Sequence, residues 1–564
     1  MLMGVFVMTP RLDAQTPAVE ATLEQLTLAD KAAQLIMLWV DGSPPTPENG
    51  AYHQLVGLIE SQHIGGLVMS TGTPTSAAGK LSLLQDRSRI PLLVAADFEA
   101  GTGFRLRGGS TFPTNMGVGA SGSEAAAYTM GQIIAEEARA LGVHITFSPV
   151  VDVNNNPENP IINTRSFGSD PDLVARMGAA QIRGSQEHGV FATAKHFPGH
   201  GNTSTDSHLA LPVIDKSWAE LSSLELRPFR SAIEAGVEIV MSAHIALPNL
   251  HPKRDAERRP ATMLPEVLTG ILRDSLGFQG LVVTDALDMG GVVRGYGPGE
   301  AAVQAFLAGS DILLMPTDPI QAIEAIVQAV EAGRISSSRL DRSVRRILVL
   351  KERMGLFTTR QVRLDAVDSV FDRASSKQAT ARASAEALVL VKDSDAVIDS
   401  IQVRKRSLTV VTYGEANAGS VGRTLTAELE RRGYATRRFA LSPASLPASY
   451  DSAQRLLDSA RIRLVVVSIR ALESKGALGT PEPLVSLLTR RSAGGQTLLI
   501  SLGSPYLLSH VPNVPGYIVG WESNPIVERA LAAALMGDPI TGRLPVEIPP
   551  SWPVGWGIQR GTQP

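Results

Sequence analysis

Eight short apolar, β-branched runs recur along the first 320 residues, and amphipathic helical patterns separate most of them. The runs span 31–40, 64–70, 91–97, 143–153, 190–197, 237–245, 280–287 and 310–316, and the clearest helical patterns span 123–142, 171–189 and 319–333. Near-continuous apolar strands that alternate with helices are typical of a parallel sheet covered on both faces. Eight such units predict a (β/α)8 TIM-type barrel, with a doubly wound open sheet as the alternative.

The 564-residue chain is too long for one domain of ordinary size. Further strand-like runs at 387–391, 407–414, 463–469, 497–503 and 517–521 predict a second, smaller α/β sandwich domain with a parallel sheet. We expect the barrel over residues 19–360, a linker over 361–385 and the C-terminal domain over 386–564. Residues 1–18 begin with the apolar run MLMGVFVM and are interpreted either as an export signal cut near Ala14 or as a disordered tail. An exported, periplasmic or extracellular location is slightly favoured over a cytoplasmic one.

Composition excludes several classes of function. Lys and Arg number 52 against 55 Asp and Glu, and they are scattered, so no nucleic acid partner is expected. The sequence contains no stretch of 18 apolar residues, so no membrane span is predicted. The chain has no cysteine, which excludes disulfides, thiolate zinc sites and cysteine nucleophiles. Carboxylate and imidazole chemistry remains, no cofactor is expected, and the oligomeric state is left open.

Ionisable residues follow the predicted strands. Those directly at or just beyond the strand ends are Asp41, Asp97, Glu99, Asp152, Arg165, Lys195, His196, His244 and Asp285. In a (β/α)8 barrel the carboxyl ends of all strands meet at one face, where active sites are built. The pattern therefore predicts a functional pocket at that rim.

The most unusual segment is KHFPGHGNTSTDSH, residues 195–208, which holds three histidines, a lysine and an aspartate and has Phe197 as its only long apolar side chain. Its Pro and Gly residues preclude a helix, so we expect a loop, and loops of this kind often carry function. Four side chains are candidate metal ligands: His196, His200, Asp206 and His208. A His-x3-His pair normally needs a helix to align it, so a metal site is not favoured. A purely structural loop is the other alternative.

Asp206 and His208 are two residues apart, which places them on the same side of an extended segment. A carboxylate there can fix the tautomer of the imidazole and make a proton donor and acceptor near neutral pH. Asp285 ends a buried run, where a lone carboxylate beside a cation suits a nucleophile. The alternative for Asp285 is a helix N-cap. Gly117–Gly122 matches G-x-G-x-x-G but follows no strand, so dinucleotide binding is not favoured.

With these residues in view, the chain resembles the family 3 glycoside hydrolases, and within them the NagZ-type β-N-acetylglucosaminidases. The strongest match is KHFPGHG (195–201) followed by the DSH triplet (206–208), and the second is LRDSLGFQGLVVTDALDM (272–289). Weaker matches are ADFEAG (96–101), FSPVVDV (147–153), RSFG (165–168), SAHIALP (242–248) and GRLPVEIP (542–549).

The resemblance implies a barrel followed by an α/β sandwich domain, and a retaining exo-β-N-acetylglucosaminidase. Asp285 would be the nucleophile that forms a covalent glycosyl-enzyme, and His208, oriented by Asp206, would be the acid/base. The positions expected to hold the sugar hydroxyls are Asp97, Arg105, Arg165, Lys195 and His196. The loop before Arg105 departs from the family, which usually has Gly-Gly-Arg where this chain reads Ala100-Gly101-Thr102-Gly103.

The substrate implied is a saccharide with terminal β-linked GlcNAc, from cell-wall fragments or chitooligosaccharides. A β-glucosidase or xylosidase of the same family, with its acid supplied by a Glu of the second domain, is one alternative. A GlcNAc phosphorylase is another, because an imidazole acid/base repels phosphate less than a carboxylate does. A non-enzymatic carbohydrate-binding protein is least favoured, since the nucleophile and the dyad are both retained.

Overall fold

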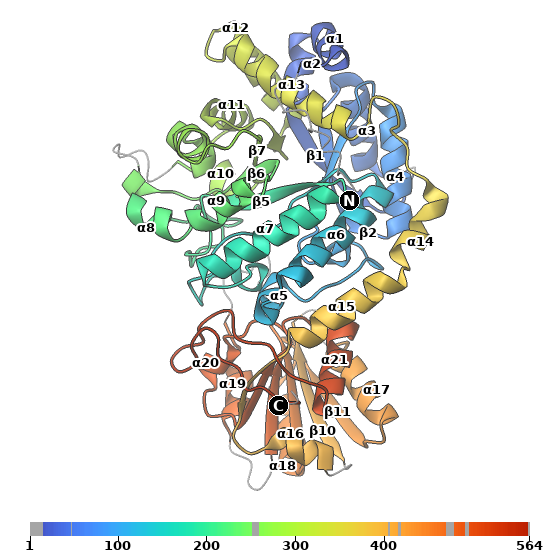
Figure 1. Cartoon of the computed structure of the whole chain (residues 1–564), viewed down its shortest axis with the longest axis vertical. Coiled ribbons are helices and arrows are strands. Elements are labelled where there is room, and N and C mark those ends of the chain that lie inside the picture. The colour runs from blue at the N-terminus through green and yellow to red at the C-terminus, as the bar shows by residue number, and fades with distance from the viewer. Residues whose placement is uncertain are drawn as a thin grey trace, which may run out of the picture.

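The computed structural model describes residues 15–46, 48–250, 259–403, 407–415, 419–469, 479–490 and 496–561 (Figure 1). Residues 1–14, which belong to the segment interpreted above as an export signal or a disordered tail, lie outside these ranges. No helix in the described ranges is both long and apolar enough to cross a membrane.

The first part of the chain is a closed barrel of eight parallel strands. They are β1 (Ile36–Gly42), β2 (Gly66–Gly72), β3 (Leu93–Ala96), β4 (Ile145–Thr146), β5 (Phe191–Phe197), β6 (Ile239–Ser242), β7 (Leu281–Thr284) and β8 (Leu313–Leu314). Their order is β7-β6-β5-β4-β3-β2-β1-β8, and a parallel bridge between Val283 and Ile312 joins the two ends. Six strands lie within their predicted runs, and β1 and β2 each extend two residues beyond theirs. The ring confirms the TIM-type barrel and excludes the doubly wound sheet.

Several strands are shorter than their predicted runs, and β1 and β4 are two examples. Residues 31–33 belong to helix α2 (Leu28–Ala33), because Thr27 and Asp30 form a capping box that starts a helix there. β4 has two residues, although its apolar run extends to 153. Residues beyond it still follow β5, since Val151 N–H donates to the Lys195 carbonyl at 2.8 Å.

Helices surround the barrel as the sequence pattern requires. The predicted helices appear as α6 (Glu124–Leu141), α7 (Pro171–Glu187) and α12 (Pro319–Glu331). Their N-caps are Ser123, Asp170 and Asp318, whose side chains accept from the first turn. The other α-helices of this part are α1 (Pro17–Gln25), α3 (Gly50–Gln62), α4 (Pro74–Arg87), α5 (Asn115–Ser121), α8 (Trp218–Ser223), α9 (Leu226–Glu234), α10 (Gly290–Val293), α11 (Pro298–Ala308) and α13 (Ser337–Arg353), with a π-helical stretch at Glu266–Ser275.

The second part is a three-layer sandwich around a six-stranded sheet. The strands are β9 (Val389–Asp393), β10 (Leu408–Gly414), β11 (Thr436–Leu441), β12 (Ile462–Ser468), β13 (Gln496–Ser501) and β14 (Gly516–Val519), in the order β11-β10-β12-β13-β14-β9. Helices α16 (Val397–Val403), α17 (Arg423–Arg431) and α21 (Pro525–Leu535) cover one face, and α18 (Pro447–Asp458), α19 (Glu482–Thr489) and α20 (Leu507–His510) cover the other (Figure 1).

The predicted all-parallel sheet is wrong at one edge, where β9 pairs antiparallel with β14. β11 was also not predicted. It is an edge strand of sequence TRRFAL, and all its side chains but the last are partly exposed, so the apolar signal of a buried strand is missing. The sandwich architecture itself is confirmed.

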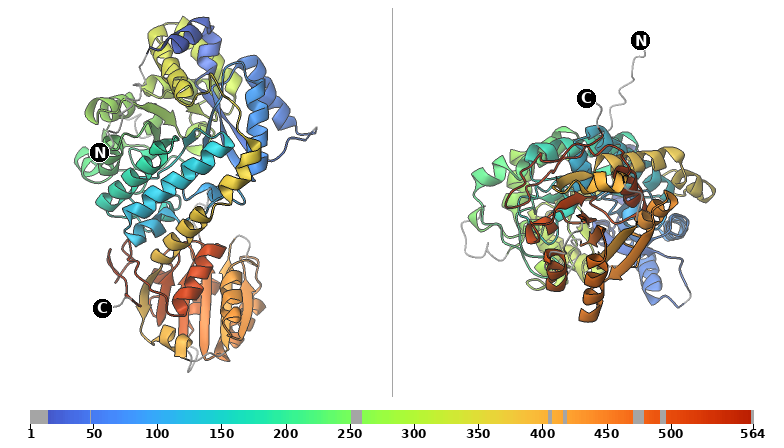
Figure 2. Two further views of the ribbon diagram at one scale, coloured as in Figure 1. Left: turned by 45° about the vertical axis from the view of Figure 1, so that its right-hand side comes forward. Right: turned by 90° about the horizontal axis from the view of Figure 1, so that it is seen from below.

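Two helices connect the parts. α14 (Val367–Phe371) and α15 (Ala374–Glu386) lead from the barrel to β9, as the turned view in Figure 2 shows. α5 supplies Met116 and Ala120 to the apolar core of the second domain. On this helix a Cβ at Gly117 would lie 3.0 Å from the Trp521 ring, and one at Gly119 would lie 1.9 Å from the Phe167 carbonyl oxygen. The G-x-G-x-x-G match therefore serves close packing, against the second domain at Gly117 and within the barrel domain at Gly119.

Candidate active site

A cavity of about 350 Å³ opens at the carboxyl ends of the barrel strands. Among the described residues its lining comes entirely from the barrel: Trp39, Val68, Ser70, Asp97, Glu99, Arg105, Phe147, Ile161, Arg165, Lys195, His196, His200, Ser207, His208, Met241, Asp285, Ala286, Asp288, Met289, Leu314 and Met315. Seven of the eight residues predicted to form the site line it. The eighth, Asp206, lies behind His208.

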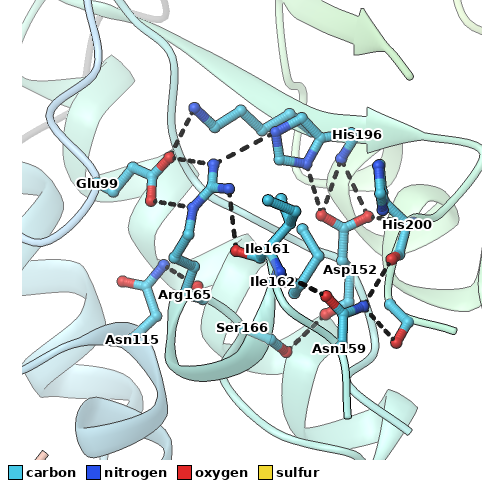
Figure 3. A network of polar contacts seen from close by, with 12 residues as sticks. Glu99, Asn115, Asp152, Asn159, Ile161, Ile162, Arg165, Ser166, His196 and His200 are labelled. Atoms are coloured by element: carbon cyan, nitrogen blue, oxygen red, sulfur yellow. Dashed lines mark hydrogen bonds and ion pairs between the residues drawn. The ribbon is translucent and has the colours of Figure 1, made fainter. Parts of the chain in front are cut away.

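A chain of ion pairs forms one wall of this cavity. Lys195, on β5, lies with its Nζ 2.8 Å from Asp97 Oδ1 and 2.8 Å from Glu99 Oε1. Arg105 donates to Asp97 at 3.1 Å, and Arg165 grips Glu99 with two hydrogen bonds of 2.7 and 2.9 Å. The Arg165–Glu99 pair is drawn in Figure 3. Five side chains from three separate segments of the chain thus meet near the ends of β3 and β5.

The wall keeps its charges at neutral pH. Burial by itself would raise the pKa of Asp97, but the charges of Lys195 and Arg105 outweigh it and lower that pKa. For Glu99 burial is likewise opposed by Arg165 and Lys195, which hold the pKa well below its ordinary value. Burial would lower the pKa of Lys195, and the two carboxylates raise it instead. The wall thus presents several closely spaced, fixed hydrogen-bond donors and acceptors to the cavity, and these suit a neutral ligand rich in hydroxyl groups.

His196 is held by a fully buried carboxylate (Figure 3). Asp152 Oδ2 lies 2.7 Å from His196 Nδ1, and its Oδ1 accepts from the His200 N–H at 2.7 Å. The other ring nitrogen of His196, Nε2, therefore points toward the cavity and lies 3.5 Å from a guanidinium nitrogen of Arg165. Burial lowers the pKa of His200 to about 4, so its ring is neutral at pH 7.

Asp206 and His208 form the predicted pair by a different local geometry. Residues 207–209 are a turn, so the expectation of an extended segment is wrong. Asp206 Oδ1 accepts from the His208 N–H at 2.9 Å and lies 3.0 Å from His208 Nδ1. The Asp206 side chain is 1% exposed and that of His208 is 24% exposed. The carboxylate thus fixes Nδ1 as the protonated nitrogen and leaves Nε2 for a ligand.

Asp285 follows β7 and reaches the same cavity. Burial would raise its pKa, but His196, His244, the Ala286 N–H and Lys195 together lower it, so the carboxylate is ionised at neutral pH. Its Oδ1 accepts from the Ala286 N–H at 2.8 Å. The next helix, α10, starts at Gly290 with Met289 at its N-cap, which excludes the N-cap alternative for Asp285.

Comparison with known proteins shows the family of the chain. The glycosyl hydrolase family 3 N-terminal domain matches residues 27–350. The chain belongs to glycosyl hydrolase family 3. It is an enzyme that breaks glycosidic bonds, and its similarity to members of the family extends beyond the barrel into the second domain.

Three relatives illustrate that extent. A β-N-acetylglucosaminidase/β-glucosidase of Cellulomonas fimi is 32% identical over 554 residues, which cover 94% of this chain and 95% of the relative. The solved family 3 β-N-acetylglucosaminidase of Paenibacillus sp. str. FPU-7 superposes with a TM-score of 0.82 at 33% identity, covering 93% and 99% of the two chains. A structure of the β-glucoside phosphorylase BglX with bound 2FGlc gives a TM-score of 0.85 at 28% identity, covering 96% and 98%.

Several residues of this family 3 enzyme were expected at the rim but do not line the cavity. Asp41 pairs with Lys80 at 3.1 Å, away from it. His244 is fully buried, and its Nε2 lies 2.9 Å from the Ala286 carbonyl, so it supports the backbone next to Asp285. No group of three or more His, Asp or Glu side chains suited to a metal ion occurs in the ranges that the structure describes.

Two supporting residues were missed from sequence. Glu137, on α6, is 1% exposed and accepts from the Ser110 hydroxyl and N–H and from the Thr102 hydroxyl. It thereby anchors both ends of the loop that carries Arg105. Tyr506, in the second domain, accepts from Asn154 at 3.0 Å, two residues beyond Asp152. Neither residue has a local signal, because each acts through a partner far away in the chain.

Proposed function

We propose that this family 3 hydrolase is a retaining exo-β-N-acetylglucosaminidase that removes terminal β-linked GlcNAc from cell-wall fragments or chitooligosaccharides. The observation that carries the proposal is that Asp285, the Asp206–His208 pair and the buried ion network at the ends of β3 and β5 meet at one cavity. The names of the relatives from Cellulomonas fimi and Paenibacillus sp. support the same substrate class.

In the first step Asp285 attacks the anomeric carbon as an ionised carboxylate. A bond forms between its Oδ and C1, and the bond from C1 to the leaving oxygen breaks. Nε2 of His208 gives that oxygen its proton. Asp206 accepts the Nδ1–H of His208 and stabilises the imidazolium from which the proton is donated.

In the second step the same His208, now neutral, takes a proton from water at Nε2. The oxygen of that water attacks C1, and the ester bond to Asp285 breaks. Two inversions at C1 leave the product with the β configuration of the substrate. During both steps Asp97, Arg105, Lys195, Arg165 and His196 would hold the hydroxyl groups of the sugar.

The acid/base assignment rests on which groups reach the cavity. The carboxylates that line it, within the described part of the chain, are Asp97, Glu99, Asp285 and Asp288, all from the barrel. Asp97 and Glu99 are committed to Lys195 and the two arginines, and Asp288 lies only three residues beyond the nucleophile. This favours the imidazole over a second-domain Glu, the acid that the β-glucosidase alternative requires.

The test compares p-nitrophenyl β-GlcNAc with p-nitrophenyl β-glucoside for the wild type, Asp285→Ala and His208→Ala. We expect the GlcNAc substrate to be preferred and Asp285→Ala to lose about 10⁴-fold or more in kcat. His208→Ala should lose less on p-nitrophenyl GlcNAc than on chitobiose, because p-nitrophenolate leaves without a proton. A preference for the glucoside would contradict the substrate, and full activity of Asp285→Ala would contradict the mechanism.

Phosphorolysis is the second candidate, favoured by the imidazole acid/base and by the BglX phosphorylase among the structural relatives. In that case phosphate in place of water attacks C1 in the second step and gives a sugar 1-phosphate. Turnover with and without inorganic phosphate separates the two. Free GlcNAc formed at the same rate in both conditions supports hydrolysis.

A further inference from the structure

The cavity has two chemically different walls. The side chains that β3 and β5 and their loops contribute are mostly charged. Those from β8, β1 and β2, which are neighbours in the sheet, and from the segment after β7 are mostly apolar: Trp39, Val68, Leu314, Met315 and Met289. The ion network suits hydroxyl groups, so the apolar wall needs a separate explanation.

Trp39 is the most unusual member of the apolar wall. It lies on β1 and is 50% exposed, whereas Met37, which precedes it on the same face of the strand, is 2% exposed. A large aromatic surface left open inside a cavity costs hydration free energy unless a ligand covers it. Met315 is held beside β1 at a left-handed φ of 48°, with its N–H donating to the Met37 carbonyl at 2.9 Å. Strain of this kind in a non-glycine residue is typical of functional sites.

The exposures place Trp39 at the mouth. Glu99, Lys195 and His196 are 5% exposed or less, so the closed end of the cavity lies around them, whereas Trp39 is 50% exposed. In an exo-acting enzyme the terminal sugar occupies the closed end, and the leaving group lies toward the opening. His208 lies beside the segment after β7, because the Gly290 N–H donates to the His208 carbonyl at 3.2 Å, and only β8 separates β7 from β1 in the ring. Trp39 and His208 line the same cavity, and Trp39 lies at the opening through which the leaving sugar must pass.

We propose that Trp39 is the platform for the leaving-group sugar. The inference rests on the proposed function above and adds a binding site for the second sugar ring. A β-linked pyranose with equatorial hydroxyls presents axial C–H groups on its faces, and these pack on the face of an indole while the hydroxyls stay in water. Such a contact selects saccharide leaving groups over small ones.

The experiment uses two substrates that differ only in the leaving group, chitobiose and GlcNAc β-fluoride, with Trp39→Ala and Trp39→Phe. We expect kcat/KM of Trp39→Ala on chitobiose to fall by roughly 10- to 100-fold, and that on the fluoride to change by less than about threefold. Trp39→Phe retains most of the chitobiose activity. Trp218→Ala is the matched control, because Trp218 is 42% exposed on α8 and does not line the cavity.

The ratio of the two activities within one variant corrects for any loss of folded enzyme. Equal falls on both substrates, or no fall on either, would overturn the proposal. A wild type that prefers cellobiose and glucosyl fluoride would refute the GlcNAc assignment alone. The same ratio measured with the glucose pair would then decide the role of Trp39.

Discussion

The buried Lys195 gives the most demanding test of the ion network. Its Nζ lies 2.8 Å from a carboxylate oxygen of Asp97 and 2.8 Å from one of Glu99, and the residue is 2% exposed. At an effective dielectric of about 20, each contact at this separation is worth about 6 kcal/mol of Coulomb energy before desolvation is subtracted. Lys195→Met keeps the volume and removes the charge. Breaking a buried pair on one side costs about 3–5 kcal/mol, and we expect a loss of that size in the free energy of unfolding at pH 7.

The pH dependence gives this prediction its sign. In the wild type the pKa values of Asp97 and Glu99 are lowered, so their contribution to stability is full above the unfolded pKa values and is lost as pH falls through the folded ones. In Lys195→Met only Arg105 and Arg165 still oppose burial, so both pKa values rise, and protonation relieves the charge that Lys195 no longer compensates. The deficit measured by urea unfolding should therefore shrink between pH 7 and pH 4.5.

Lys351→Met is the matched control. Lys351 is fully buried and donates to Gln34, and in the described ranges it makes no ion pair. Burial lowers the pKa of Lys351 to about 7. As pH falls from the ordinary lysine range toward 7, the unfolded chain binds this proton and the folded chain does not, so the folded state loses stability. We expect this variant to be at least as stable as the wild type at pH 7. If Lys195→Met costs no more than Lys351→Met, or if its deficit is the same at both pH values, the reasoning is refuted.

Three further predictions follow from the site. Asp206→Asn should lower kcat on chitobiose by about 100-fold or more and p-nitrophenyl GlcNAc turnover by much less, since the orientation of His208 matters only when the leaving group needs a proton; equal losses on both substrates would count against the dyad. Glu137→Gln should raise KM by about tenfold with a smaller change in kcat, because the loop that presents Arg105 to the sugar loses its anchor; an unchanged KM in steady-state kinetics would refute this role. Because the pKa of Asp285 is lowered, inactivation by a 2-fluoro sugar with a dinitrophenyl leaving group should have one rate from pH 8 to pH 5 and slow only below about pH 4; a midpoint near pH 6 would contradict an ionised nucleophile.

The strands of the barrel and the residues at their ends could be predicted because both signals are local. An apolar run such as 190–197 marks a buried strand, and Lys195 and His196 at its end must then reach the rim. The antiparallel pairing of β9 and the edge strand β11 could not be predicted. The direction in which a strand pairs is decided by tertiary contacts, and TRRFAL carries no apolar alternation.

In the active site, too, some features could be predicted from sequence and others could not. Asp206 and His208 were paired correctly from their spacing, although a turn and not an extended segment brings them together. The hydrogen bond from the Thr102 hydroxyl to Glu137 joins a loop and a helix 35 positions apart in the chain. No sequence motif predicts a contact of this kind. In the sequence, Trp39 cannot be distinguished from the other apolar residues of its strand. Only its exposure at the cavity mouth distinguishes it from the core.

The most direct test of the account is to trap the glycosyl-enzyme with a 5-fluoro GlcNAc fluoride, digest the protein and locate the label by mass spectrometry. The fluorine slows both steps, and the fluoride leaving group keeps the first step faster than the second, so the intermediate accumulates. The account predicts one sugar per chain, on the peptide that contains Asp285 and on that carboxylate. A label on any other residue, or none in an enzyme that is inactivated, would contradict it.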